Sequence, residues 1–129
     1  MIVADTSVWI SLLRKDDDEI GRKLRTSILQ GNVLLGDVIL LEVLQGARDH
    51  LHAISIEESF HDFPIVQMLS PKLAVKAAEN YRTLRERGIT VRKTIDIIIG
   101  TYCIEHGHRL LQRDKDYLPM AEHLGLRLA

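Results

Sequence analysis

Hydrophobic residues along the chain form short runs that alternate with longer stretches of helical spacing. A run of three or so apolar residues between polar or turn residues predicts a short buried strand, and a period of three to four residues predicts a helix. The expected strands are Ile2–Ala4, Val33–Leu35, Pro64–Val66, Leu110–Leu111 and Leu126–Leu128. The expected helices are Thr6–Arg14, Asp18–Gln30, Asp37–Gly46, His50–Phe60, Pro71–Gly88, Ile95–His106 and Tyr117–Leu124. Alternating strands and helices predict an α/β fold with a mainly parallel sheet.

Several of these helices carry start signals. Ser70 before Pro71 is a strong one, because serine caps a helix and proline suits its first position. Thr6 or Ser7, Asp37 and Thr94 are the expected caps of three other helices. The helix at Ile95–His106 is apolar on nearly every side, which predicts a central, buried position.

The overall composition is that of an ordinary globular protein, with 46% hydrophobic and 27% charged residues. A length of 129 residues predicts one domain, residues 1–129. The net charge of −1 argues against binding to nucleic acid by bulk charge alone. We expect no secretory signal and no membrane span, and the single cysteine, Cys103, fits a cytoplasmic protein without disulfides.

Acidic residues follow or flank several of the expected strands. Asp5 ends the first strand, Glu42 lies in the helix after the second, Asp96 lies in the first turn of the buried helix, and Asp114 and Asp116 follow the fourth strand. In a parallel sheet the carboxyl ends of the strands lie at one edge, where ligands bind. These five acids, distant in sequence, are therefore expected to converge.

Convergent carboxylates repel one another, and burial makes their ionisation costly, so such a cluster favours a bound cation. Oxygen ligands select hard ions, here Mg²⁺ or Mn²⁺. The sequence thus predicts metal-dependent, in-line attack of an activated water on a phosphodiester, with one acid helping to remove its proton.

Each acid also has a plainer interpretation. Asp5 could only cap the next helix, Glu42 could lie on a solvated helix face, and Asp96 could only favour the helix dipole. One acid of the Asp114–Asp116 pair could be a turn residue. The run Asp16–Asp18 is typical of a helix start, and we expect no catalytic role for it.

Basic residues near these acids in sequence are candidates for contacts to RNA phosphates. They are Arg92, Lys93, Arg113 and Lys115. Each could equally be a solvated surface charge. Base specificity is not visible, because aromatic residues form only 5% of the chain.

Four segments together resemble the PIN-domain nucleases, and their order and spacing resemble the short VapC-type toxins of bacterial toxin–antitoxin pairs. The first has a strand that ends in Asp followed by Thr or Ser, the second a Glu-bearing helix, the third an acidic helix start, and the fourth a strand followed by Asp-x-Asp-aromatic. In this chain they are Ile2–Ser7, Ile39–Gly46, Thr94–Ile99 and Leu111–Tyr117. Gln112 departs from the pattern, which often has Thr there.

The resemblance implies a three-layer α/β/α fold and an endoribonuclease that depends on Mg²⁺ or Mn²⁺. It also implies homodimers and a small antitoxin protein that blocks the site. By the same resemblance, Asp5, Glu42, Asp96 and Asp114 are the catalytic acids and metal ligands; Asp116 could share or replace Asp114 as a ligand. Thr6 is either a hydroxyl that supports these acids or a helix cap.

Two other functions are compatible with a strand-end aspartate. One is a magnesium-dependent aspartate phosphatase or phosphoacceptor, but a phosphatase has a second Asp where this chain has Ser7, and neither scheme uses Glu42. The other is a PIN-like module that binds RNA or protein without cleavage, which the presence of all four acids disfavours.

Overall fold

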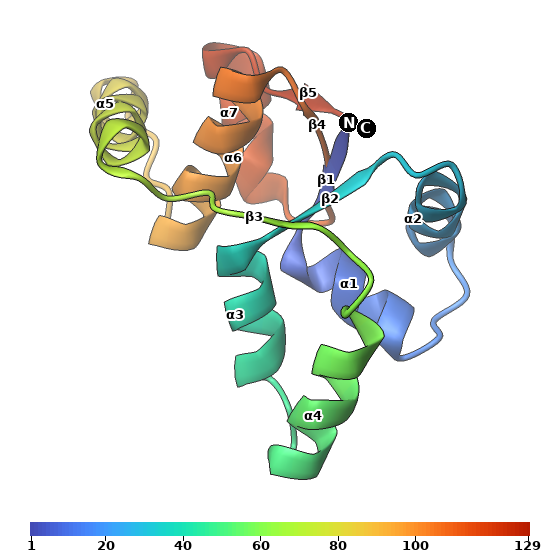
Figure 1. Cartoon of the computed structure of the whole chain (residues 1–129). Coiled ribbons are helices and arrows are strands. Elements are labelled where there is room, and N and C mark those ends of the chain that lie inside the picture. The colour runs from blue at the N-terminus through green and yellow to red at the C-terminus, as the bar shows by residue number, and fades with distance from the viewer.

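A parallel sheet of five strands lies at the centre of the computed structural model, which describes residues 1–129 (Figure 1). The strands are β1 (Ile2–Ala4), β2 (Val33–Gly36), β3 (Ile65–Val66), β4 (Arg109–Leu111) and β5 (Arg127–Leu128). Their order is β3-β2-β1-β4-β5, and every neighbouring pair is parallel. The first strand of the chain is therefore the middle strand of the sheet.

Seven α-helices surround the sheet. They are α1 (Thr6–Leu13), α2 (Glu19–Leu29), α3 (Asp37–Gln45), α4 (His50–Ser59), α5 (Pro71–Glu86), α6 (Thr94–His106) and α7 (Leu118–Leu124), and a 3-10 helix, η1 (Lys115–Tyr117), precedes the last of them. Figure 1 shows α5, α6 and α7 on one side of the sheet and α1 and α2 on the other, while α3 and α4 extend past its carboxyl edge. The expected three-layer α/β/α fold is confirmed.

Helix α6 is the most buried helix, as its apolar sequence predicts. All eight residues from Asp96 to Cys103 are buried. Gly100 allows the close approach of α7, because a Cβ atom there would lie 2.4 Å from the sulfur of Met120. Asp96 is thus held on a rigid element in the protein interior.

Three expected helix caps are wrong, and the chain enters each helix one residue earlier. The N-cap positions belong to Asp5 for α1, Gly36 for α3 and Lys93 for α6, and none of these makes a side-chain cap bond. The prediction for α5 is confirmed, since the Ser70 hydroxyl accepts the Leu73 N–H at 3.1 Å. A capping residue one step from a strand end is poorly specified by local sequence.

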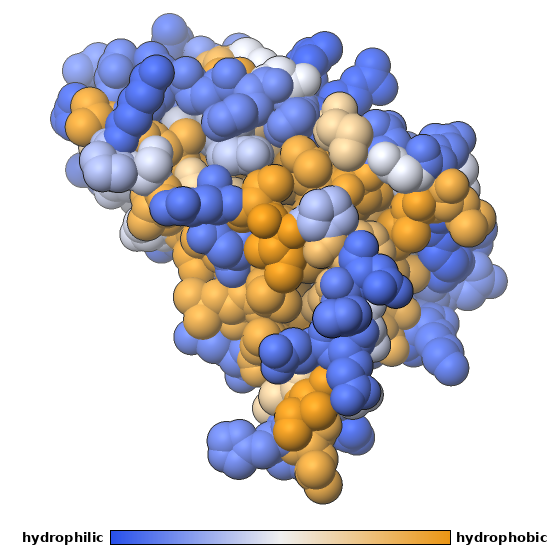
Figure 2. Space-filling view, viewed as in Figure 1, coloured by the Kyte–Doolittle hydropathy of each residue, from blue (hydrophilic) through white to orange (hydrophobic).

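Apolar side chains are exposed on the face of the molecule seen in Figure 1. Figure 2 shows hydrophobic atoms in the middle of this face and at its lower end, over α3 and α4. On these two helices the exposed large hydrophobic residues are Leu41, Leu51 and Ile54. None of the helices combines the length and the apolar composition that crossing a membrane requires.

Candidate active site

A cleft of about 690 Å³ opens at the carboxyl edge of the sheet, where the acids were expected to meet. Four acids from four parts of the chain line it: Asp5 directly after β1, Glu42 on α3, Asp96 in the first turn of α6 and Asp114 just before η1. A parallel sheet brings these positions together because the strands β1 and β4 are neighbours and end at the same edge.

Two of these acids, Asp5 and Asp96, form a buried pair. Their exposed fractions are 6% and 4%. The buried hydroxyl of Tyr117 lies 3.1 Å from Asp5 Oδ1 and 3.2 Å from Asp96 Oδ1, so one phenol bridges both carboxyl groups. Burial raises the pKa of Asp5, and burial together with the charge of Asp5 raises the pKa of Asp96 to about 6.

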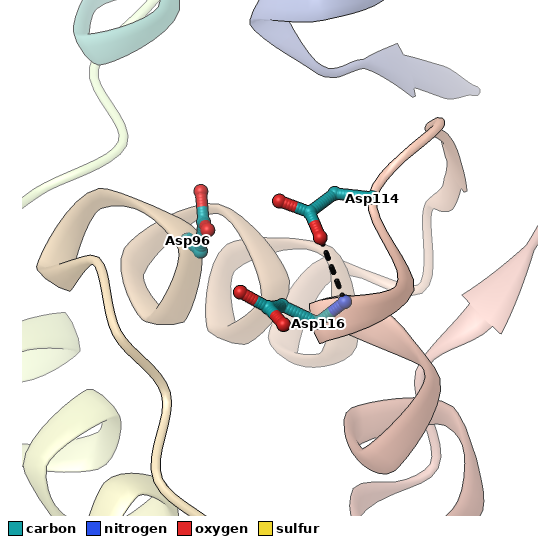
Figure 3. A group of neighbouring side chains, drawn as sticks. All are labelled: Asp96, Asp114 and Asp116. Atoms are coloured by element: carbon teal, nitrogen blue, oxygen red, sulfur yellow. Dashed lines mark hydrogen bonds between the residues drawn. The ribbon is translucent and has the colours of Figure 1, made fainter.

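The second oxygen of Asp96 has no hydrogen-bond partner although it is buried. A buried oxygen without a partner is costly and needs an explanation. Carboxylate oxygens of Asp96, Asp114 and Asp116 lie within 4.8 Å of one another, and Figure 3 shows the three carboxyl groups around a common space. An all-oxygen group of this size fits a hard divalent cation.

Asp114 and Asp116 differ in what holds them. Asp114 Oδ1 accepts the backbone N–H of Asp116 at 2.9 Å (Figure 3), which leaves its other oxygen for a ligand. The carboxylate of Asp116 accepts hydrogen bonds from the Arg92 guanidinium at 3.1 to 3.3 Å. Only Asp114 lines the cleft, so Asp116 is the more peripheral member of the group.

Thr6 and Glu42 are joined across the cleft by a short hydrogen bond. The Thr6 hydroxyl donates to Glu42 Oε1 at 2.5 Å and links α1 to α3. Thr6 is therefore not a helix cap, and Glu42 does not lie on a plain solvated face. Asp5 likewise makes no side-chain cap bond, so capping does not explain its position either.

The four basic candidates separate into two groups. Lys93, Arg113 and Lys115 line the cleft, whereas Arg92 lies outside it and pairs with Asp116. Arg113 also forms an ion pair with Asp18 at 2.5 Å. The Asp18 carboxylate caps α2 through the Gly21 N–H at 2.8 Å, and this bond and Arg113 lower its pKa.

Two residues of the site were not anticipated by sequence reasoning. Tyr117 was expected only as the start of a short helix and as the aromatic residue of the fourth motif, and that motif was the one signal available. Asp18 was expected as part of a helix start, which it is, but its contact with Arg113 had no signal in the sequence.

Comparison with known proteins identifies the family. The model of the PIN domain matches residues 2–122. The chain belongs to the PIN-domain family. This PIN domain is 28% identical over 131 residues to Ribonuclease VapC11 from Mycobacterium tuberculosis, covering all of this chain and 98% of the relative.

Solved structures agree with this fold. VapBC2 from Rickettsia felis, bound to a DNA fragment from its promoter, superposes with a TM-score of 0.79 and 17% identity, covering 100% of this chain and 98% of that one. A toxin–antitoxin complex from Klebsiella pneumoniae gives a TM-score of 0.68 and 17% identity over 91% of this chain and 90% of that one. The PIN-like architecture inferred from the motifs is confirmed, while the roles of the individual site residues stay predictions.

Proposed function

We propose that this PIN domain is a metal-dependent endoribonuclease and the toxin of a VapBC-type toxin–antitoxin pair. The observation that carries the proposal is the convergence of four acids in one cleft, with a buried Asp96 oxygen that has no partner within the protein. The VapC ribonuclease to which the chain is similar over its whole length supports RNA as the substrate. An enzyme of this kind acts in the cytoplasm.

Asp96 and Asp114 would hold Mg²⁺ or Mn²⁺ together with Asp116, whose carboxylate has an oxygen within 4.8 Å of theirs but is also engaged by Arg92. Asp5 and Glu42 line the same cleft and would complete the set of ligands. Bound there, the ion would supply activation of a water molecule and stabilisation of the charge on the phosphate. The hydroxyl of Tyr117 contacts both Asp5 and Asp96 and so holds their carboxylates at a fixed separation.

The remaining side chains of the cleft act on the substrate. Lys93, Arg113 and Lys115 bind phosphates and offset the repulsion between RNA and the acids. Arg113 is oriented for this by its ion pair with Asp18. A carboxylate of the cluster accepts the proton of the attacking water, with Glu42 oriented by the Thr6 hydroxyl.

The test is cleavage of a mixed pool of structured RNAs by the purified protein with Mg²⁺ or Mn²⁺. Cleavage should disappear with EDTA and in Asp96→Asn, and it should persist in Glu86→Gln, which removes an exposed carboxylate on α5. A folded protein that binds Mn²⁺ but cuts no RNA would overturn the ribonuclease proposal, and hydrolysis of a simple phosphomonoester would favour the phosphatase alternative.

A small antitoxin protein is the proposed partner. A hollow lined by Ile10, Leu13, Val43 and Ile56 lies between α1, α3 and α4, and Ile10 also lines the acidic cleft. Arg14, Arg48 and His52 line the same hollow, so it combines apolar and basic surface. A partner that covers it therefore reaches the acids. The neighbour from Klebsiella pneumoniae, described as a toxin–antitoxin complex, supports this partner.

A homodimer is the second proposed assembly. An apolar hollow of about 520 Å³ between α5 and α6 includes Ala78, Tyr81 and Ile98, and a second copy of the chain would cover it. Light scattering should give a dimer for the wild type and a monomer for Ala78→Asp, which places a charge in this hollow. A monomeric wild type would exclude the dimer.

A further inference from the structure

A second hollow, of about 500 Å³, lies between α2 and the β4–β5 end of the sheet. Three basic side chains line it, Arg22 and Lys23 from α2 and Arg109 from β4, against one acidic side chain, Glu19. We refer to it as the basic groove. Its floor also includes Ile2 and Leu111, so it combines apolar surface with positive charge.

The strand register explains why the Arg109 side chain lies on this floor. Ile2 pairs with Arg109 in parallel strands, and both line the groove. Residues paired across parallel strands point to the same face of a sheet, which here is the face toward α2. Arg127 pairs with Arg109 in β5, but its guanidinium donates to the Gly107 carbonyl oxygen and does not line the groove. The hollow lies between this part of the face and α2.

The basic groove and the acidic cleft are linked by β4 and the segment that follows it. Arg109 and Leu111 line the groove, and Arg113, two residues further along the chain, lines the cleft. Arg113 contacts Asp18, the capping residue of α2, so the segment between the two hollows is tied to the start of α2. At the rise of a strand, the four residue steps from Arg109 to Arg113 span roughly 13 Å.

The charges along this wall are not equally available. Arg22 forms an ion pair with Asp17 at 2.7 Å, and Arg113 forms one with Asp18. Lys23 and Arg109 are exposed and take part in no ion pair. The unpaired positive charges of Lys23 and Arg109 attract a polyanion. They favour its approach to the acidic cleft from the side of α2 and β4.

We propose that the basic groove is an extended binding site for single-stranded RNA, with Lys23 and Arg109 contacting phosphates of the strand that continues from the acidic cleft. This inference rests on the proposed function, because it takes RNA as the substrate. The proposal also gives the path of the RNA, which runs from the carboxyl edge of the sheet along β4 toward the amino end of β4. RNA long enough to leave the cleft then binds more tightly than a trinucleotide.

Binding of fluorescently labelled RNA to protein carrying Asp96→Asn, with Mg²⁺ present, tests this without cleavage. The groove variant is Lys23→Ala with Arg109→Ala. The matched control is Lys72→Ala with Arg87→Ala at the two ends of α5, on the opposite side of the molecule (Figure 1), where both residues are exposed and form no ion pair. For a long single strand we expect the groove variant to lose about tenfold in affinity. The slope of log affinity against log salt should fall by about 1.4, or roughly 0.7 for each lost contact.

Comparing the binding of a short and a long RNA decides whether the basic groove binds the strand. A trinucleotide should bind the groove variant and its parent equally, and Lys23→Arg with Arg109→Lys should restore the affinity for long RNA. Equal behaviour of the groove and control variants, or equal losses for both RNA lengths, would overturn the proposal. If long RNA binds through the groove but the wild type cuts no RNA with metal present, the ribonuclease proposal fails while the binding site stands.

Discussion

The acids in and beside the cleft form an inner and an outer group that are stabilised in different ways. The inner pair, Asp5 and Asp96, is buried, shares one phenol and has raised pKa values. Of the outer acids, Glu42 accepts a threonine hydroxyl and Asp116 has an arginine counter-charge. The outer acids are stabilised by these contacts within the protein, whereas Asp5 and Asp96 form no ion pair and one Asp96 oxygen has no hydrogen-bond partner. We therefore expect the inner pair to depend most on a bound cation.

The strongest test of the difference between the inner and the outer acids is to neutralise one acid from each group. We expect Asp96→Asn to lower the rate of RNA cleavage by about a thousandfold, because it removes a buried ligand, and Asp116→Asn to lower it by about tenfold. Initial rates at saturating Mn²⁺ measure both, with Glu86→Gln as the control. Equal losses in the two variants would contradict the distinction.

Metal binding at the inner pair should stabilise the folded protein measurably. At a Mn²⁺ concentration about a hundredfold above its dissociation constant, the free energy of unfolding should rise by about 2.7 kcal/mol. Thermal unfolding with and without EDTA measures this rise. Asp96→Asn should show little of it and Asp116→Asn most of it; a full shift in Asp96→Asn would place the ion elsewhere.

Without metal, the pH dependence of stability should also identify the inner pair. The pKa of Asp96 is about 6 in the folded protein against 3.8 for an ordinary aspartate, so its contribution to stability is present below pH 4 and is lost as the pH rises through 6. Asn does not titrate. Above pH 7 in EDTA, Asp96→Asn should therefore be more stable than the wild type by about 2 kcal/mol, relative to their difference at pH 4.

Urea unfolding at the two pH values measures this difference. A stability gap between Asp96→Asn and the wild type that stays constant from pH 4 to pH 7 would show that Asp96 ionises normally. Glu86→Gln should show no such change in the gap, because its carboxylate is exposed on α5.

The smallest expected effect concerns the phenol that joins the inner carboxylates. Tyr117→Phe keeps the buried ring and removes the hydroxyl that lies 3.1 and 3.2 Å from Asp5 and Asp96. We expect a loss of about tenfold in Mn²⁺ affinity, equivalent to about 1.4 kcal/mol, because the carboxylates lose their fixed separation. Titration calorimetry measures it, and an unchanged affinity would restrict Tyr117 to packing.

Much of the architecture was predictable from local sequence. Apolar runs identified all five strands, and Ser70 with Pro71 identified the start of α5. The position of Asp5, Asp96 and Asp114 in one cleft followed from the parallel sheet, because its topology alone places strand ends and helix starts at one edge.

Side-chain contacts between distant segments were not predictable in this way. Nothing local to Tyr117 shows that its hydroxyl reaches Asp5, and nothing local to Arg113 shows that it meets Asp18. Such contacts depend on side-chain conformation and on the packing of helices, which no periodicity records. Three expected helix caps were wrong because each helix begins one residue earlier than expected. Local sequence does not distinguish a cap from the first helical residue beside it.

The central position of β1 has a consequence for how the acidic cleft assembles. Strand β1 pairs in the sheet with β4, and Asp5 meets Tyr117 across 112 residues of chain. Contacts that are so far apart in sequence form only after the intervening chain is available. A chain truncated before Tyr117 therefore has no assembled acidic cleft, and we expect it to cleave no RNA.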